Sequence, residues 1–349
     1  MPSVRPNIAE MKGYVPGEQP QGLEKFIKLN TNENPYQCSP KVKAAIGRLV
    51  QAGLHKYPDP LATAFRIRAG ELHGVDPDWI LCGNGSDDIL TIVTRAFVGT
   101  SDMVRFANPS YLLYRTLAEI QGAACDIINY NADWSLPDEF AQPNDWLRLA
   151  YLANPNSPSG TMVPPQKVAE LAASLPCPLL VDEAYVDFAE SNCVSLVAEN
   201  EQIMVARSLS KSYALAGLRF GYLIAQPQVI RELCKVKDSY NCDSLSIAGA
   251  TAAIDDQAWL AETRARLLAT RARMATALAE IGFDVVDSQA NFVWCTREGA
   301  PVEPIYRELK KSGVLVRYML YPGWGDGVRI TVGTDDQVDA CLELLRTLV

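Results

Sequence analysis

The stretch that decides the fold is residues 208–221, Ser-Leu-Ser-Lys-Ser-Tyr-Ala-Leu-Ala-Gly-Leu-Arg-Phe-Gly. It follows residues 203–207, a short apolar run of the kind that forms a buried strand. Lys211 therefore stands at the exit of a strand, between two serines and upstream of Arg219. An amine in that place can attack an aldehyde, and hydroxyl groups with a guanidinium can hold a phosphate. A solvated surface loop would also accommodate these residues.

Outward from this stretch, apolar runs alternate with helical patterns from about residue 40 to 245. Seven runs are candidate strands, at residues 80–82, 103–107, 126–130, 148–153, 178–182, 203–207 and 221–225. Several are continuously apolar, as strands are when both faces of their sheet are covered. The alternation predicts an α/β fold with a mostly parallel, seven-stranded sheet covered by helices.

The rest of the chain predicts a smaller α+β domain. Residues 258–281 contain no Gly or Pro and repeat apolar side chains at helical spacing, which predicts one long helix. Thr334 and Gln337 predict a capping box at the start of a last helix. Strands are expected near residues 284–295, 314–318 and 328–332.

The expected organisation has four parts. Prolines and glycines before residue 28 predict an extended N-terminal arm. The arm and the start of the small domain take residues 1–39, the large domain 40–246, an interdomain helix 247–281 and the small C-terminal domain 282–349. A typical domain has about 150 residues, so a chain of 349 residues is likewise predicted to have about two domains.

The composition excludes several classes of function. With 41 acidic and 32 basic residues, the net charge of −9 argues against capture of nucleic acid or an anionic membrane, but not against a local anion site. Nine scattered cysteines without a C-x-x-C pair indicate free thiols in a reducing compartment. Two histidines are few for a His-based metal site or a Ser-His-Asp triad. No secretory signal or membrane-spanning run is found, so the expected location is the cytoplasm.

A second segment is residues 181–185, in which Asp182 is the last residue of an apolar strand. A carboxylate at the carboxyl edge of a parallel sheet points into the crevice where ligands bind. There Asp182 can keep a pyridinium nitrogen protonated, and Tyr185 can donate to a phenolate oxygen of the same ring. A strand-end aspartate that caps the following helix is the alternative.

Three more segments have the same strand-then-turn pattern. Residues 81–88 read Leu-Cys-Gly-Asn-Gly-Ser-Asp-Asp, a glycine-rich turn that presents N–H groups to a phosphate. Asp88 occupies the third glycine position of G-x-G-x-x-G, which argues against a dinucleotide. Residues 154–160, Asn-Pro-Asn-Ser-Pro-Ser-Gly, form a turn after a strand. Tyr111, in Pro-Ser-Tyr, can stack on a flat heterocycle or pack at a rim.

Together and in this order, the five segments resemble the fold-type I pyridoxal-phosphate aminotransferases of the aspartate aminotransferase class, over nearly the whole chain. The resemblance implies that Lys211 forms a Schiff base with pyridoxal 5'-phosphate and then carries the proton. It implies that Asp182 pairs with the pyridine nitrogen, Tyr185 with the ring hydroxyl, and that Tyr111 stacks on the ring. The implied phosphate site consists of Gly85, Ser86, Asp87, Ser208, Ser210 and Arg219.

Two positions qualify this resemblance. Tyr57 is similar to the tyrosine that reaches the phosphate from the neighbouring subunit, which implies a homodimer with shared active sites. The family usually has Asn directly before Pro-Thr-Gly, where it bonds the ring hydroxyl. Ser157 stands there in this chain and Asn156 precedes it, so either Ser157 makes a weaker bond or Asn156 reaches in.

Further segments resemble the histidinol-phosphate aminotransferases within this family. They are residues 28–36 with Asn32, residues 13–17 with Tyr14 on the arm that covers the substrate, and residues 314–317 and 328–334. Arg329 resembles the carboxylate fork of the class, and Arg317 would add the charge that a substrate phosphate needs. Arg317 on the outer face of its strand is the alternative. Asn291 is expected at the substrate or cofactor rim, or in a structural role.

The resemblance implies a transamination that interconverts histidinol phosphate and 2-oxoglutarate with imidazole acetol phosphate and glutamate, in histidine biosynthesis. An aromatic amino-acid aminotransferase on the same scaffold is the nearest alternative, followed by a phosphothreonine decarboxylase-like enzyme. A catalytically silent, cofactor-binding regulator is disfavoured, because the cofactor-binding set is complete and the chain has no basic DNA-binding module.

Overall fold

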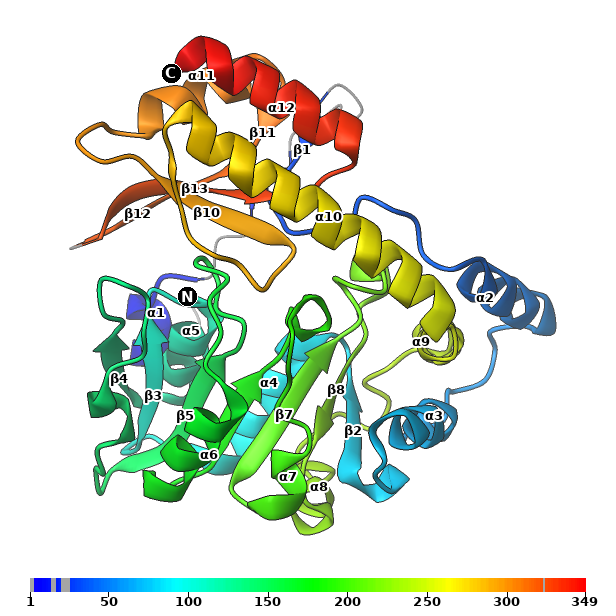
Figure 1. Cartoon of the computed structure of the whole chain (residues 1–349). Helices are drawn as coiled ribbons and strands as arrows, with labels where there is room; N and C mark the ends of the chain where they lie inside the picture. Colours follow the sequence, from blue (N-terminus) through cyan, green and yellow to red (C-terminus); the bar gives the residue numbers. More distant parts are fainter. Residues whose placement is uncertain (1–2, 14–16, 20–25, 323) are drawn as a thin grey trace.

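The computed structural model describes residues 3–13, 17–19, 26–322 and 324–349. Two sheets lie one above the other in Figure 1, and the chain ends beside the upper one. We call them the large sheet and the small sheet. Their facing edges enclose the pocket described below.

The large sheet has seven strands in the order β2-β8-β7-β6-β5-β3-β4. The strands are β2 Ile80–Gly83, β3 Met103–Asn108, β4 Ala124–Asn129, β5 Leu147–Ala153, β6 Leu179–Asp182, β7 Ile203–Ser208 and β8 Gly221–Ile224. All neighbours pair in parallel, except that β8 runs antiparallel to both β2 and β7. Each of the seven predicted runs forms one of these strands, so the prediction of a mostly parallel sheet is confirmed.

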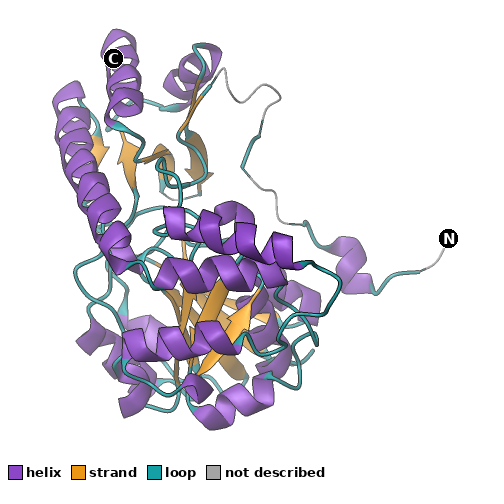
Figure 2. Ribbon diagram, turned by 90° about the vertical axis from the view of Figure 1, so that its right-hand side faces the viewer, coloured by secondary structure: helices purple, strands orange, loops and turns teal. Residues whose placement is uncertain are grey.

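Helices cover both faces of the large sheet, and Figure 2 shows the strands between them. Successive residues of a strand point to opposite faces, so Leu180 and Met204 enter one core cluster, and Val181 and Val205 enter the other. The first face is covered by α4 Ser86–Phe97, α5 Leu113–Gln121 and α8 Pro227–Leu233. The second is covered by α2 Pro40–Ala52, α3 Thr63–His73, α6 Pro165–Ser174, α7 Leu196–Glu199 and α9 Ser244–Ile254.

The small sheet is antiparallel, with strands in the order β12-β13-β10-β9. Its strands are β9 Asp284–Val285, β10 Phe292–Thr296, β12 Arg317–Tyr321 and β13 Gly325–Thr331. Its core is shared with α10 Gln257–Ile281, α11 Glu303–Lys311 and α12 Asp335–Leu348. The predicted long helix is confirmed as α10, and Thr334 and Gln337 form the predicted capping box.

The N-terminal arm differs from its prediction, because Pro6–Glu10 form helix α1. Proline at the first helical position is already in helical geometry. Arg5 Nη2 donates to the carbonyl of Ile120 (2.8 Å), and Asn7 Nδ2 donates to that of Glu119 (2.7 Å), at the end of α5. The prediction of an extended arm is therefore wrong here, because tertiary contacts stabilise a helix too short to show periodicity.

Two connections bear on the expected division of the chain. Strand β1 Ile27–Lys28 pairs in parallel with β11 Val314–Leu315, so the arm leads directly to the small-sheet layer. The expected boundary at residue 247 lies inside α9, which packs against α2 and α3. The chain consequently leaves the large-sheet layer along α10, after α9 has ended.

One aromatic contact joins the two layers at the surface. Trp134 follows β4, and its ring lies 4.4 Å from that of Trp324, in the turn between β12 and β13. Trp134 has φ of 65°, in the left-handed region that side chains other than glycine rarely adopt. Its turn is closed by a hydrogen bond from Asn131 N to Ser135 O (3.0 Å).

A buried ion pair lies below the pocket. Arg207, on β7, pairs with Glu183 (Nε–Oε2 2.7 Å) and with Asp187 (Nη1–Oδ1 3.2 Å). The Glu183 side chain is fully buried, and its Oε1 accepts the backbone N–H of Cys193. These bonds fix the segment that follows β6 against the segment that carries Lys211.

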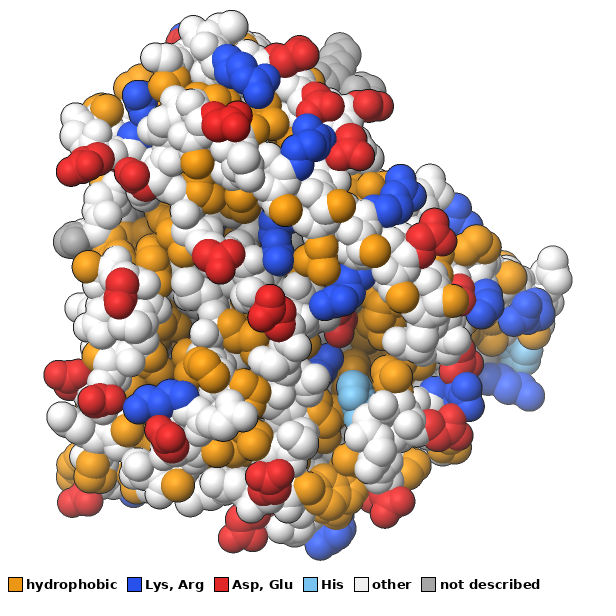
Figure 3. All heavy atoms as spheres, in the orientation of Figure 1, with side chains coloured by type: hydrophobic (Ala, Val, Ile, Leu, Met, Phe, Trp, Pro, Cys, Tyr) orange, Lys and Arg blue, Asp and Glu red, His pale blue; other side chains and the backbone are white. Residues whose placement is uncertain are grey.

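The surface and the cysteines agree with the composition. On the face drawn in Figure 3, acidic and basic side chains are interspersed, without a large area of positive charge alone. All nine cysteines are free thiols, and six of them are buried. In the described part of the chain, no helix has the length and apolarity needed to cross a bilayer.

Replacing Arg207 with Met should lower the free energy of unfolding by about 3–5 kcal/mol, because the Glu183 carboxylate would stay buried without its partner. Urea denaturation followed by circular dichroism measures this loss. Arg273→Met is the matched control: its ion pairs with Asp335 and Asp339 are solvent-exposed, so it should lose less than about 1 kcal/mol. Equal losses in the two variants would contradict the argument.

Candidate active site

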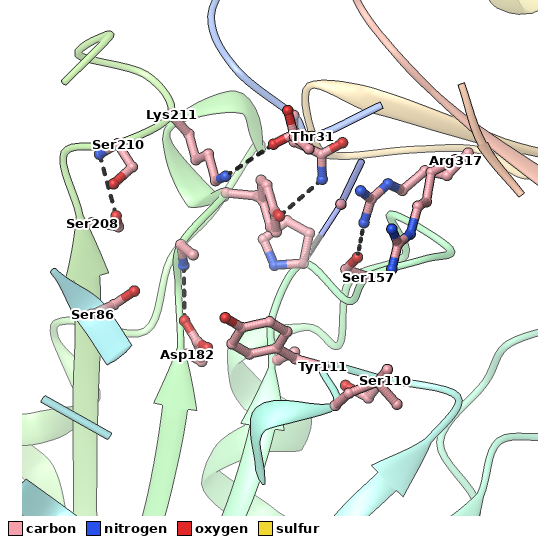
Figure 4. Close-up of a pocket in the computed structure, with 18 of the residues that line it drawn as sticks. Thr31, Ser86, Ser110, Tyr111, Ser157, Asp182, Ser208, Ser210, Lys211 and Arg317 are labelled. Carbon is pink, nitrogen blue, oxygen red and sulfur yellow. Dashed lines mark hydrogen bonds between the residues drawn. The ribbon is translucent and has the colours of Figure 1, made fainter. Parts of the chain in front are cut away.

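The pocket lies where β5, β6 and β7 end, between the large sheet and the small sheet. Figure 4 shows Lys211, Ser208 and Ser210 on one side of it and Ser157 and Arg317 on the other. The residues that line it from the large-sheet layer include Ser86, Asp87, Ser110, Tyr111, Leu112, Tyr114, Ala153, Pro155, Ser157, Asp182, Tyr185, Ser208, Ser210, Lys211 and Arg219. The remaining lining includes Gly17, Asn30, Thr31, Asn32, Arg317, Met319, Tyr321 and Arg329.

Lys211 comes three residues after the end of β7 and extends across the pocket. Its Nζ donates to the carbonyl of Thr31 (3.4 Å) and lies 5.7 Å from the centre of the Tyr185 ring. Asn34 Nδ2 donates to the carbonyls of Lys211 (3.1 Å) and Ser212 (3.0 Å). The backbone is thereby fixed while the amine stays in the pocket.

Asp182 ends β6 and is 5% exposed. Its Oδ2 accepts the hydroxyl of Tyr114 (2.8 Å), and its Oδ1 accepts the backbone N–H of Ala184 (3.2 Å). Burial raises the pKa of Asp182 to about 6, although both hydrogen bonds oppose the rise. A cationic group in the pocket would therefore find a buried anionic partner already oriented.

Tyr114 was not predicted from the sequence as a site residue. It stands in the first turn of α5, three residues after Tyr111, and both side chains line the pocket. Its place three residues after Tyr111 is the signal in the sequence that could have indicated it, because the turn before α5, closed by Tyr114 N donating to the Tyr111 carbonyl (3.3 Å), brings the two residues together.

The glycine-rich turn forms a cradle for an anion at the start of α4. Gly85 has φ of 84°, and a Cβ there would lie 2.6 Å from Arg219 Nη2. A Cβ on Gly221 would lie 2.5 Å from Ser86 N. Only glycine allows this approach, which brings the helix N-terminus, hydroxyls and a guanidinium together. Their convergence suits a phosphate.

Hydrogen bonds order the side chains of this cradle. Arg219 donates to Ser210 Oγ (Nη1, 3.4 Å) and to Asp87 Oδ2 (Nη2, 3.1 Å). Tyr111 donates its hydroxyl to the other oxygen of Asp87 (3.0 Å), and Ser210 N donates to Ser208 Oγ (3.2 Å). The ring of Tyr111 and the guanidinium of Arg219 are therefore oriented by one carboxylate.

Asn32 links the two layers at the hydroxyl of Tyr185. Its Nδ2 donates to the Tyr185 hydroxyl (2.9 Å), and its backbone has φ of 56°. Thr331 accepts the N–H of Asn32 and donates to its Oδ1, both at 3.0 Å, while Asn291 Nδ2 donates to its carbonyl (3.0 Å). Asn291 is buried and is not among the lining residues, so it supports Asn32 and does not face the pocket.

Two arginines face the pocket from the small sheet. Arg317 and Arg329 are register partners on β12 and β13, so their side chains leave the sheet on the same face. Both line the pocket. Arg317 is therefore not on the outer face of its strand, which was the alternative that the sequence left open. Arg329 donates to Ser157 Oγ (2.8 Å) and to the carbonyl of Asn30 (3.1 Å).

The structure also distinguishes Ser157 from Asn156. Ser157 lines the pocket and accepts the bond from Arg329. Asn156 is buried behind the wall, where its Nδ2 donates to the Pro109 carbonyl (3.1 Å) and to Ser159 Oγ (3.0 Å). The Asn156 side chain therefore braces the loop, and Ser157 is the member of the pair that faces the pocket.

Tyr57, which was also expected at the site, is not among the lining residues. Tyr57 is 81% exposed and stacks on Tyr240, with ring centres 4.5 Å apart. Tyr14 lies outside the described residues. In the part of the chain that the structure describes, no cluster of three or more His, Cys, Asp or Glu side chains is arranged to hold a metal ion.

Comparison with known proteins then identifies the family. A family model described as aminotransferase class I and II matches residues 24–345. A histidinol-phosphate aminotransferase of Rhodopirellula baltica is 54% identical over 98% of this chain and 94% of its own length. The chain belongs to the histidinol-phosphate aminotransferases. Another member, from a Nostoc species, is 44% identical over 99% of this chain and 98% of its own.

Solved structures show the same fold as this aminotransferase. The histidinol-phosphate aminotransferase of Sinorhizobium meliloti, in complex with pyridoxal-5'-phosphate, has a TM-score of 0.86 at 24% identity, covering 99% of this chain and 98% of its own. The aspartate aminotransferase of Thermotoga maritima has a TM-score of 0.81 at 18% identity, covering 93% and 92%. The predicted fold-type I architecture is therefore confirmed.

The pH dependence of stability should report on Asp182 in the cofactor-free protein. Its pKa of about 6 in the folded state exceeds the ordinary value of 3.8, so the folded state holds the proton more tightly and loses stability as the pH rises from about 4 through 6. Asp182→Asn lacks this titration. Relative to the parent, its melting temperature should therefore increase as the pH rises from 4.5 to 7.5, by the equivalent of about 2 kcal/mol.

Thermal melts monitored by circular dichroism across that pH range measure the difference. Asp138→Asn is the control, because the Asp138 side chain is 94% exposed and should show no such trend. A constant offset between Asp182→Asn and the parent at every pH would contradict the assignment.

Proposed function

We propose that this aminotransferase transfers the amino group of histidinol phosphate to 2-oxoglutarate, giving imidazole acetol phosphate and glutamate, as a step of histidine biosynthesis. The observation that carries the proposal is the pair Arg317 and Arg329 on one face of the small sheet, opposite Lys211 and Asp182. The identity to relatives named for this activity supports it.

The pocket fits pyridoxal 5'-phosphate as the cofactor. The cradle at Gly85 and Arg219 matches its phosphate, the Asp182 carboxylate matches its ring nitrogen, and the Lys211 amine matches its aldehyde. When bound, the cofactor supplies a carbonyl that exchanges amines and a ring that accepts electrons from the substrate carbon. Tyr111 would stack on the ring.

The chain's own residues then have separate tasks. Asp182 holds a proton at the ring nitrogen, because its buried carboxylate is fixed by two hydrogen bonds. Lys211 Nζ moves a proton at the amino-bearing carbon, a contribution of about 10²–10⁴-fold for a positioned base. Tyr185, which is oriented by Asn32, and Ser157 would bond the ring hydroxyl.

Two arginines explain how one pocket accepts both amino donors. Histidinol phosphate has no α-carboxylate and carries a phosphate ester on the carbon that takes its place, and guanidinium groups bind either anion in a bidentate manner. Met319, Tyr321 and Leu112 also line the pocket, and they offer the less polar surface that an imidazole ring requires. We assign the substrate anion to Arg317 and Arg329 together.

The remaining parts of the proposal concern assembly and location. We infer a cytoplasmic homodimer in which Tyr57 contributes to the partner's cofactor site, since Tyr57 is exposed and is not among the residues that line its own pocket. We also propose the division into arm, large domain, connecting helix and small domain expected at residues 1–39, 40–246, 247–281 and 282–349, with the start of the connecting helix moved from 247 to 257, where α10 begins. Tyr14 is proposed to cover the substrate.

Arg317→Ala should test the substrate. Losing a hydrogen-bonded charge costs about 1.5–3 kcal/mol, so kcat/KM for histidinol phosphate should fall by roughly 10–100-fold. Half-reaction rates with histidinol phosphate, phenylalanine and phosphothreonine measure the preference. Arg307→Ala, an exposed arginine on α11, is the control and should behave as the parent. Preference of the parent for phenylalanine, or decarboxylation of phosphothreonine, would refute the proposal.

A mixing experiment should test the shared site. Lys211→Ala should lose amine transfer, and Tyr57→Ala should lose most of it through weaker cofactor binding. In a mixed dimer, one site would combine Lys211 of the Tyr57→Ala chain with Tyr57 of the Lys211→Ala chain, and this site would be intact. Mixing the two inactive variants after dissociation should therefore restore up to about a quarter of the parental activity. No recovery, with mixed dimers demonstrated, would exclude shared sites.

A further inference from the structure

We propose that Tyr114 is a positioning residue, which holds the Asp182 carboxylate ionised and in fixed orientation toward the ring nitrogen of the bound cofactor. This inference rests on the proposed function, since it concerns the same pocket. Tyr114 is fully buried, and its hydroxyl donates to Asp182 Oδ2 at 2.8 Å. Such a bond to an ionised acceptor is about twice as strong as a neutral one.

The Tyr114 ring is held so that its hydroxyl has one direction. It stacks on Tyr151, with ring centres 4.6 Å apart and planes within 5°. The Tyr151 hydroxyl is in turn bonded to Thr94 Oγ1 (2.5 Å) and donates to the carbonyl of Leu90 (3.2 Å) on α4. The stacked rings, on α5 and β5, thus hold the Tyr114 phenol against the end of β6, whereas the Tyr151 hydroxyl is directed to α4.

Tyr114 also touches the side chain that we expect to stack on the cofactor. The rings of Tyr114 and Tyr111 meet edge to face, with centres 5.6 Å apart and planes at 88°. Tyr111 is fixed at its other end by its bond to Asp87. One buried tyrosine therefore supports two separate cofactor contacts, at the ring nitrogen and at the ring face.

The need for such a donor follows from the surroundings of Asp182. Burial disfavours its charge, and the carboxylates of Asp87 and Glu183 disfavour it further. The Tyr114 hydroxyl and the Ala184 N–H oppose these effects in the cofactor-free protein. Without the Tyr114 bond, the free Oδ2 would take up a proton more readily, and the carboxylate would rotate about its last bond.

The test compares Tyr114→Phe with Tyr151→Phe. Each removes one buried hydroxyl and keeps the ring stack, but only Tyr114→Phe removes a bond to Asp182. For Tyr114→Phe, the dissociation constant of pyridoxal phosphate should rise about ten-fold. It is measured by titrating the cofactor into the cofactor-free protein and following the quenching of intrinsic fluorescence. The kcat of Tyr114→Phe should fall about ten-fold or more with KM within two-fold. Tyr151→Phe should stay within two-fold of the parent in all three.

Thermal melts of both cofactor-free variants give the structural control, and both should melt within a few degrees of the parent. Parental cofactor affinity and kcat in Tyr114→Phe would overturn the inference, as would equal losses in Tyr151→Phe, which would indicate packing alone. Both results presuppose a parent that binds the cofactor and transfers amines. A parent that does neither would instead overturn the proposed function.

Discussion

Much of this structure depends on a carboxylate buried at the end of a central strand. Asp182 and Glu183 are adjacent, and they leave the chain in opposite directions: one faces the pocket, and the other faces Arg207 in the interior. Each needs its own partner, because an unpaired buried charge is costly. The segment after β6 is thus fixed on both sides, between the ends of β5 and β7.

The same reasoning explains how an acidic protein binds anions. The net charge is −9, yet Lys211, Arg219, Arg317 and Arg329 all line one pocket. Arg219 is oriented by Asp87, and Arg329 by Ser157 and a backbone carbonyl. Pre-oriented guanidinium groups lose little side-chain freedom when an anion binds, so local geometry outweighs the unfavourable overall charge.

The sequence was most informative where burial dictates residue type. The seven strands and helix α10 follow from the pattern of apolar residues, and the capping box at Thr334 follows from Gln337 three residues later. Each is found as predicted. The strand-end segments likewise indicated the pocket, because parallel strands bring their carboxyl ends together.

Features that depend on contacts between distant segments were not accessible in this way. Helix α1 is stabilised by contacts with α5, and Asn291 supports Asn32 across 259 positions of sequence. The choice between Ser157 and Asn156 depends on the path of one loop. Tyr114 acts through the direction of a hydroxyl, which is set only when α5 packs against the sheet.

The contact between Trp134 and Trp324 has a consequence for the loop that follows β4. A left-handed backbone at a residue other than glycine costs about 1–3 kcal/mol, whereas an aromatic pair contributes about 0.5–1.5 kcal/mol beyond its buried area. The packing of the two rings offsets this cost, so the loop depends on the small-sheet layer for its conformation. Loss of the Trp324 ring would therefore release strain in a segment of the other layer.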